Sequence, residues 1–156
     1  LRLSDNPLLI QATKEVDELL CLYIDDSLLA LVKHKPEPLS PKRMAFKEAS
    51  LATLDRELGT LGQMLWRTQD CQLSDIYHLI NHLKIDKAYI SRQVGWYEQL
   101  IMQNIADASP GLKWRVGNNH TLFAEHELPF ELSNLPISFT GFRKKVEPIN
   151  ARIAQA

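Results

Sequence analysis

The 156-residue sequence has little cysteine, no excess of charge of either sign and no long hydrophobic run. Its 18 basic and 19 acidic residues leave a formal net charge of -1, so no global field holds a polyanion such as DNA. Any nucleic-acid contact must therefore be local. No apolar stretch approaches the roughly 20 residues that span a bilayer, and no signal peptide is visible. We expect a soluble, cytoplasmic protein without a membrane partner.

The sequence contains two cysteines, Cys21 and Cys71, both in apolar, strand-like surroundings. Neither belongs to a CxxC motif or has a histidine partner at metal-ligand spacing. Free cysteine is among the most frequently buried residue types. The pattern therefore favours buried, reduced core thiols over metal ligands, nucleophiles or a disulfide.

Glycine is also scarce, with six residues in the chain. These glycines form neither a GxGxxG fingerprint nor a Walker phosphate loop, both of which need closely spaced glycines between a strand and a helix. Dinucleotide binding by either device is therefore not expected.

What the sequence does contain is an alternation of short apolar runs and helical patterns, with a hydrophobic content of 45%. Short continuous apolar runs are typical of buried parallel strands. They predict strands at residues 19–24, 63–67, 87–91 and 112–116. Apolar residues at spacings of three to five predict helices at residues 5–14, 42–61, 73–83 and 97–108. Between residues 27 and 41, three prolines predict a long irregular excursion.

Strands that alternate with helices favour a parallel sheet covered on both faces, because each right-handed crossover places a helix over one face. We therefore predict an α/β fold, a three-layer, doubly wound, Rossmann-like parallel sheet. Asp5 is expected to cap the first helix, and Ser74 or Asp70 the third. The apolar stripe of the longest helix is expected to comprise Phe46, Leu51, Leu54, Leu58 and Leu61.

Three groups of polar residues could carry chemistry on their own. His78 and His82 lie one helical turn apart, but no HExxH glutamate accompanies them, which favours a solvated helix face over a metal site. The pair at 25–26, two aspartates at the carboxyl end of a strand, could bind magnesium or a ribose, yet capping or loop solvation is favoured. The basic run at 143–145 favours a solvated helix face over a phosphate site.

Two longer motifs lie near the ends of the chain. Residues 1–9 are Leu-Arg-Leu-Ser-Asp-Asn-Pro-Leu-Leu, and residues 139–147 are Phe-Thr-Gly-Phe-Arg-Lys-Lys-Val-Glu. The first resembles the DLRLxDNPAL segment and the second the FTxFRKxVE connector of the photolyase and cryptochrome family. With the α/β alternation between them, the chain is similar to the amino-terminal, antenna domain of that family, and to its DASH branch in particular.

The resemblance implies a domain organisation. Residues 1–130 would form the amino-terminal α/β domain, and residues 131–156 would begin the connector to a helical domain that binds the flavin and lies outside this chain. Family members have a strand of some seven residues before the Leu-Arg-Leu motif, at the centre of the sheet. The implied sheet therefore has about five strands, and we expect the first strand to be missing because the sequence is truncated or incomplete.

The resemblance also implies a cofactor site, in the turn that runs from Ser91 to Glu98. Relatives of the DASH branch carry a stretch similar to REVSxxE, and acidic residues of this turn contact a folate antenna. This chain matches at Arg92, at Val94 and at Glu98. It departs at Gln93, where relatives often have glutamate; glutamine offers one acceptor and one donor group where glutamate offers two acceptors. Without the resemblance, Trp96 and Tyr97 would indicate packing residues.

The implied function is that of an antenna domain of a DASH-like cryptochrome or deoxyribodipyrimidine photolyase. It would hold methenyltetrahydrofolate or a deazaflavin through Arg92, Gln93 and Glu98, and pass excitation to FAD in the adjoining domain. In isolation it would be non-catalytic, part of a photolyase-like lyase that meets DNA only through the flavin domain. Two alternatives remain. One is a small nucleotide-binding domain of the universal-stress or electron-transfer-flavoprotein type. The other is a pure interaction module, self-associating through exposed apolar residues at 128–130 and 135–137.

Overall fold

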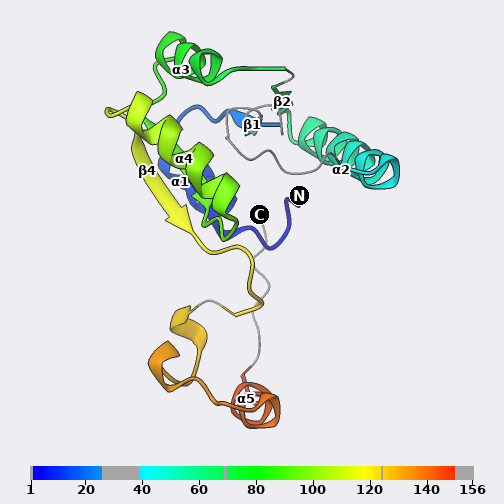
Figure 1. Cartoon of the computed structure of the whole chain (residues 1–156), viewed down its shortest axis with the longest axis vertical. Coiled ribbons are helices and arrows are strands. Elements are labelled where there is room, and N and C mark those ends of the chain that lie inside the picture. Colours follow the sequence, from blue (N-terminus) through cyan, green and yellow to red (C-terminus); the bar gives the residue numbers. More distant parts are fainter. Residues whose placement is uncertain (1, 26–38, 69, 124, 150–156) are drawn as a thin grey trace.

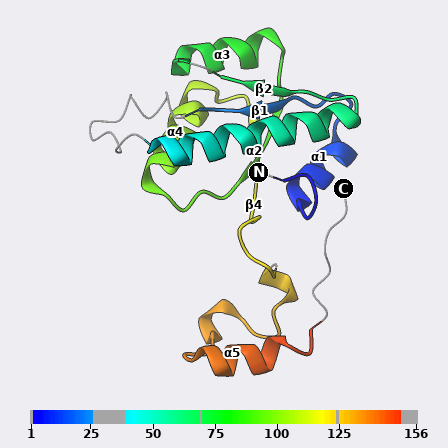
Figure 2. The same ribbon diagram turned by 90° about the vertical axis from the view of Figure 1, so that its right-hand side faces the viewer.

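The computed structural model describes residues 2–25, 39–68, 70–123 and 125–149. It shows an α/β body and a smaller lobe that ends in a short helix (Figure 1), and the same two parts are seen in the view turned by 90° (Figure 2). In chain order the elements of the body are α1 (Pro7–Glu15), β1 (Cys21–Tyr23), α2 (Pro41–Thr60), β2 (Leu65–Arg67), α3 (Leu73–His82), β3 (Lys87–Ser91), α4 (Trp96–Ala108) and β4 (Lys113–Gly117). The elements of the lobe are η2 (Glu125–Glu127), η3 (Leu132–Asn134) and α5 (Phe139–Val146).

The described strands form two parallel pairs. β1 lies beside β2, with Cys21 opposite Leu65, and β3 lies beside β4, with Lys87 opposite Lys113. The predicted α/β class with parallel strands and crossover helices is confirmed. In the described residues no ladder joins the two pairs. A single sheet of about five strands would need a strand between them, and the expected first strand stays a prediction.

The predicted elements agree with the structure in type and differ mainly at their ends. The strand predicted at 87–91 is β3 residue for residue, and the other three strands overlap their predictions. All four predicted helices are present. The proline-containing segment falls largely on residues 26–38, outside the described residues, and α2 begins at its last proline.

The helix caps differ from the predictions. Asn6, not Asp5, caps α1, because its side-chain oxygen accepts a hydrogen bond from the Leu9 amide at 3.2 Å. Asp5 itself has a φ of 52°, outside the conformation that a cap residue adopts. At α3 the cap is Gln72 rather than Ser74 or Asp70, and its amide donates to the Asp75 carboxylate at 2.7 Å.

The main core lies between α3 and α4. Ile76 and Ile105 are 2% and 4% exposed, and side chains from both strand pairs pack against them, including Leu22 of β1 and Trp114 of β4. The two pairs thus share one core although no ladder joins them. Cys21 and Cys71 are of intermediate exposure and thus less buried than predicted. Cys71 packs against this core.

The stripe of α2 is only partly buried. Leu51, Leu54 and Leu58 are buried, whereas Phe46 and Leu61 are 76% and 65% exposed. Helical spacing shows which residues share a face, but whether another element covers each end of that face depends on the tertiary structure.

The lobe is largely irregular, as expected after β4. Its centre is the edge-to-face pair of Phe130 and Phe142, with ring centroids 5.9 Å apart, and Lys145 lies over the Phe130 ring at 5.2 Å. The basic run at 143–145 occupies the last turn of α5 and is exposed, which confirms a solvated helix face. The division at residue 130 stays a prediction. None of the helices in the described ranges is long and apolar enough to cross a membrane.

Candidate functional site

The carboxyl ends of β3 and β4 lie side by side because the strands are parallel and in register. Ser91 pairs with Gly117, and the Arg92 amide donates a 2.7 Å hydrogen bond to the Gly117 carbonyl. α4 begins beside the tip of β4 (Figure 1). In open α/β sheets, ligands bind outside this edge. The predicted cofactor residues therefore lie where such a fold places a ligand.

Gln93 is held against the strand end. Its side-chain nitrogen, Nε2, donates to the Ser91 carbonyl at 3.1 Å, and its backbone carbonyl accepts from the Gln99 side chain at 2.9 Å. The side chain is half-buried. One N–H group of the Gln93 side chain is thus engaged within the turn, and its side-chain oxygen is a hydrogen-bond acceptor.

Glu98 lies in the first turn of α4, where a negative charge is favoured by the helix dipole. Its carboxyl group folds back over Gly95, the cap residue. A Cβ at Gly95 would lie 2.8 Å from the Glu98 carboxyl carbon, so the glycine makes room for this conformation. Arg92 and Glu98 are exposed. The structure thus brings Arg92, Gln93 and Glu98 into one turn, with a cationic, an amide and an anionic side chain available to a ligand.

One residue of this turn contradicts its prediction. Trp96 is 61% exposed rather than packed in the core, and its neighbour Val94 is 84% exposed. The ring of Trp96 meets that of Tyr97 edge-to-face, with centroids 5.1 Å apart and an interplanar angle of 74°. A sequence signal for this exposure existed, since the apolar stripe of α4 runs through Tyr97, Ile101 and Ile105 and leaves Trp96 off the stripe.

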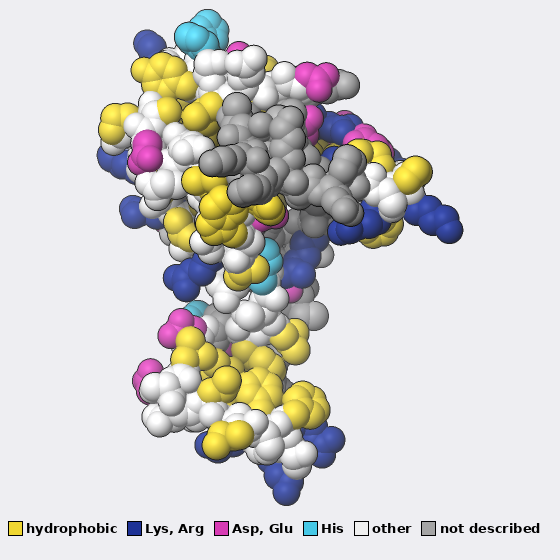
Figure 3. Space-filling view, in the orientation of Figure 1, with side chains coloured by type: hydrophobic (Ala, Val, Ile, Leu, Met, Phe, Trp, Pro, Cys, Tyr) yellow, Lys and Arg dark blue, Asp and Glu magenta, His cyan; other side chains and the backbone are white. Residues whose placement is uncertain are grey.

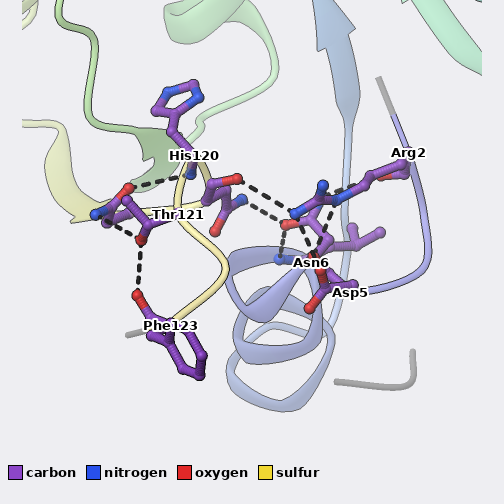
Figure 4. Close-up of polar contacts among 9 residues, drawn as sticks. Arg2, Asp5, Asn6, His120, Thr121 and Phe123 are labelled. Atoms are coloured by element: carbon purple, nitrogen blue, oxygen red, sulfur yellow. Dashed lines mark hydrogen bonds and ion pairs between the residues drawn. The ribbon is translucent and has the colours of Figure 1, made fainter. Parts of the chain in front are cut away.

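A second polar cluster lies at the start of α1 (Figure 4). Arg2 forms an ion pair with Asp5 at 3.2 Å and donates to the Asn119 carbonyl at 3.3 Å. The Asn119 side chain donates to the Asn6 oxygen at 2.7 Å, while its own oxygen is buried without a partner. The cluster ties the segment after β4 to the opening motif, so we assign it a structural role. Sequence reasoning did not identify Asn119, which is distant from that motif in the chain.

The same segment approaches α1 through packing. A Cβ on Gly117 would lie 2.8 Å from a methyl carbon of Leu8, so β4 ends with a residue that lets α1 come close. A second contact joins β3 to α1, since the Tyr89 hydroxyl donates to the Glu15 carboxylate at 2.8 Å. Hydrogen bonds from Gln11 and then Tyr89 lower the pKa of Glu15. Burial, followed by the bond to Glu15, raises the pKa of Tyr89.

The remaining candidates show no assembled site. His78 and His82 are exposed on α3, as predicted, and no three metal-ligating side chains gather anywhere in the described ranges. The Asp25 amide donates to the Thr68 hydroxyl at 3.0 Å, a bond across the ends of β1 and β2, and Asp26 lies outside the described residues. Burial raises the pKa of the Cys21 thiol, which disfavours a nucleophilic thiolate.

The fold is that of an α/β domain with parallel strands, and a polar turn lies at the carboxyl ends of β3 and β4. Comparison with known proteins identifies the family of this domain. A sequence model described as DNA photolyase matches residues 1–155. The chain belongs to the DNA photolyase family, as an amino-terminal domain.

Two curated relatives are both named cryptochrome DASH. The protein from Vibrio parahaemolyticus serotype O3:K6 is 38% identical over 152 residues, and that from Idiomarina loihiensis is 36% identical over 154 residues. Each match covers 96% of this chain and 34% of the relative. A crystal structure of the Synechocystis sp. PCC6803 cryptochrome superposes with a TM-score of 0.79 at 25% identity, covering 99% of this chain and 33% of that one. The predicted kinship with the DASH branch is confirmed, and the chain spans about a third of its relatives' length.

Proposed function

We propose that this domain holds a light-harvesting antenna chromophore, a reduced folate such as methenyltetrahydrofolate or a deazaflavin, in a DASH-like cryptochrome or photolyase. The observation that carries the proposal is the β3–α4 turn, where the oxygen of Gln93 and the carboxylate of Glu98 offer acceptors at the carboxyl edge of the sheet. The amino-pyrimidine edge of a pterin presents donors that such acceptors can pair with. Arg92 supplies a cation for an acidic tail.

The bound chromophore would supply absorption of light, and the chain's own residues would bind and orient it. No catalytic step is assigned to this domain. The hydrogen bond from Gln93 Nε2 to the Ser91 carbonyl fixes this side chain in the turn, and its oxygen would act as an acceptor for the ligand. Because glutamine at position 93 lacks the negative charge of a glutamate, Glu98 alone would provide a charge-assisted hydrogen bond to the ligand.

We further propose that a carboxyl-terminal flavin domain, which would bind FAD and meet DNA, is the partner of this one. Apolar side chains gather over the lobe (Figure 3), including Leu132, Leu135, Ile137 and Phe139, which are 50%, 52%, 108% and 76% exposed. In the absence of such a partner this surface would favour self-association. Cys21 and Cys71 are not joined by a disulfide bond, which suits the reducing cytoplasm in which we expect the protein to work.

The test is an absorption spectrum of the purified chain, before and after incubation with methenyltetrahydrofolate and, separately, with a deazaflavin. We expect a retained chromophore band that is lost when Gln93→Ala is combined with Glu98→Gln. The matched control combines Gln63→Ala with Glu57→Gln, the same chemical changes at exposed positions near the end of α2. Unchanged affinity in the first double variant would remove the β3–α4 turn from the site. A bare protein spectrum with both chromophores would contradict antenna binding by this chain.

A further inference from the structure

The β3–α4 turn carries an exposed apolar surface beside its polar groups. Val94 is 84% exposed and Trp96 is 61% exposed, although tryptophan is highly buried on average in folded proteins. Both belong to the turn that holds Gln93 and Glu98. A large aromatic ring left in water next to hydrogen-bonding groups is a feature of sites that recognise planar ligands.

The ring of Trp96 is held by a contact with its neighbour, so its rotation would break that contact. Its edge-to-face contact with Tyr97 holds the two rings at an interplanar angle of 74°, and Tyr97 belongs to the half-buried side of α4. Trp96 is also the first residue of α4, directly after Gly95, so its backbone is ordered by the helix. A preorganised aromatic side chain loses little conformational entropy when a ligand binds.

We propose that Trp96 is a stacking platform for the planar heteroaromatic ring of the ligand in this turn, while Gln93 and Glu98 accept hydrogen bonds from the edge of that ring. This inference rests on the proposed function, because it concerns the same site. Trp96 precedes Glu98 by two residues and follows Gln93 by three, so the platform and both acceptors lie on one short segment. Stacking favours a flat ring, and the two acceptors favour a ring with hydrogen-bond donors along its edge. Together they favour a pterin or flavin-like ring over an aliphatic ligand.

The experiment measures the affinity of the chain for methenyltetrahydrofolate by quenching of tryptophan fluorescence and by chromophore absorbance. Trp96→Ala is expected to weaken binding by roughly 5- to 100-fold, the range typical of losing one stacked aromatic residue. Trp96→Phe, which keeps a ring, is expected to recover most of the affinity. Trp66→Ala is the matched control, because Trp66 is 45% exposed on β2, in the other strand pair.

The outcomes separate the two proposals. Binding that is unchanged by Trp96→Ala but lost in the Gln93→Ala, Glu98→Gln double variant would overturn the stacking role and leave the antenna function standing. No binding of either methenyltetrahydrofolate or a deazaflavin by the unaltered chain would overturn both. An equal loss in Trp66→Ala and Trp96→Ala would also overturn the platform, because it would show a general effect of removing an exposed tryptophan. Circular dichroism of each variant checks that the fold is kept.

Discussion

The two strand pairs differ in length and in what surrounds them. β3 and β4 pair over five residues, and their carboxyl ends carry the candidate site together with the close approach of α1. β1 and β2 pair over three residues, and Trp66 of β2 is 45% exposed. One half of this domain therefore carries the proposed binding edge, whereas both halves contribute side chains to the shared core.

The largest expected effect comes from the core that joins the two pairs. Ile105→Ala should lower the free energy of unfolding by about 2–5 kcal/mol, because it leaves a cavity in the core. Urea unfolding followed by circular dichroism measures the loss, with Val94→Ala at an exposed position as the control. Separate transitions for the two pairs, rather than one weakened transition, would show that they do not depend on a common core.

A smaller loss is expected where β4 meets α1. Gly117→Ala should destabilise the fold by about 1–3 kcal/mol, because the new Cβ would overlap the buried Leu8 side chain. Gly111→Ala is the matched control, since nothing lies within 4 Å of its added Cβ. Equal thermal midpoints for the two variants would mean that α1 does not press on the end of β4.

The binding edge can be altered with little change in stability. Gly95→Ala should displace the Glu98 carboxyl group and weaken the binding of methenyltetrahydrofolate, while the cap substitution costs about 1 kcal/mol or less. Fluorescence titration measures the affinity, and Glu98→Gln provides the comparison. We expect the two variants to lose affinity to a similar degree. Full affinity in Gly95→Ala would show that the position of Glu98 does not matter to the ligand.

The smallest effect is a pH-dependent one at the contact between Tyr89 and Glu15. The pKa of Glu15 is lowered from 4.5 by its hydrogen bonds to Gln11 and Tyr89, so the contact stabilises the fold above that value and this contribution is lost as the pH falls through the lowered pKa. Tyr89→Phe should therefore lower the thermal midpoint slightly at neutral pH, and the difference should shrink in acid. A difference that is independent of pH would assign the effect to packing instead.

The candidate site was predictable to a limited degree. The resemblance led to Arg92, Gln93 and Glu98, and the structure places all three in one turn at the carboxyl edge, although their role stays a proposal. Neither periodicity nor motif indicated that Gln93 folds back onto Ser91, because that bond depends on how the chain leaves the strand. The exposure of Trp96 was also missed, although its position off the apolar stripe of α4 would have indicated it.

By itself the sequence determined the order and type of the elements from α1 to β4, because apolar periodicity is a local property of the chain. It also determined membership of the family, because the motifs at residues 1–9 and 139–147 can be recognised from their residues alone. The tertiary structure decided which apolar residues stay exposed, as at Phe46 and Trp96, and which distant groups meet, as at Asn6 and Asn119. The physical reason is that burial and capping depend on what packs against a residue, and that partner can lie a hundred residues away.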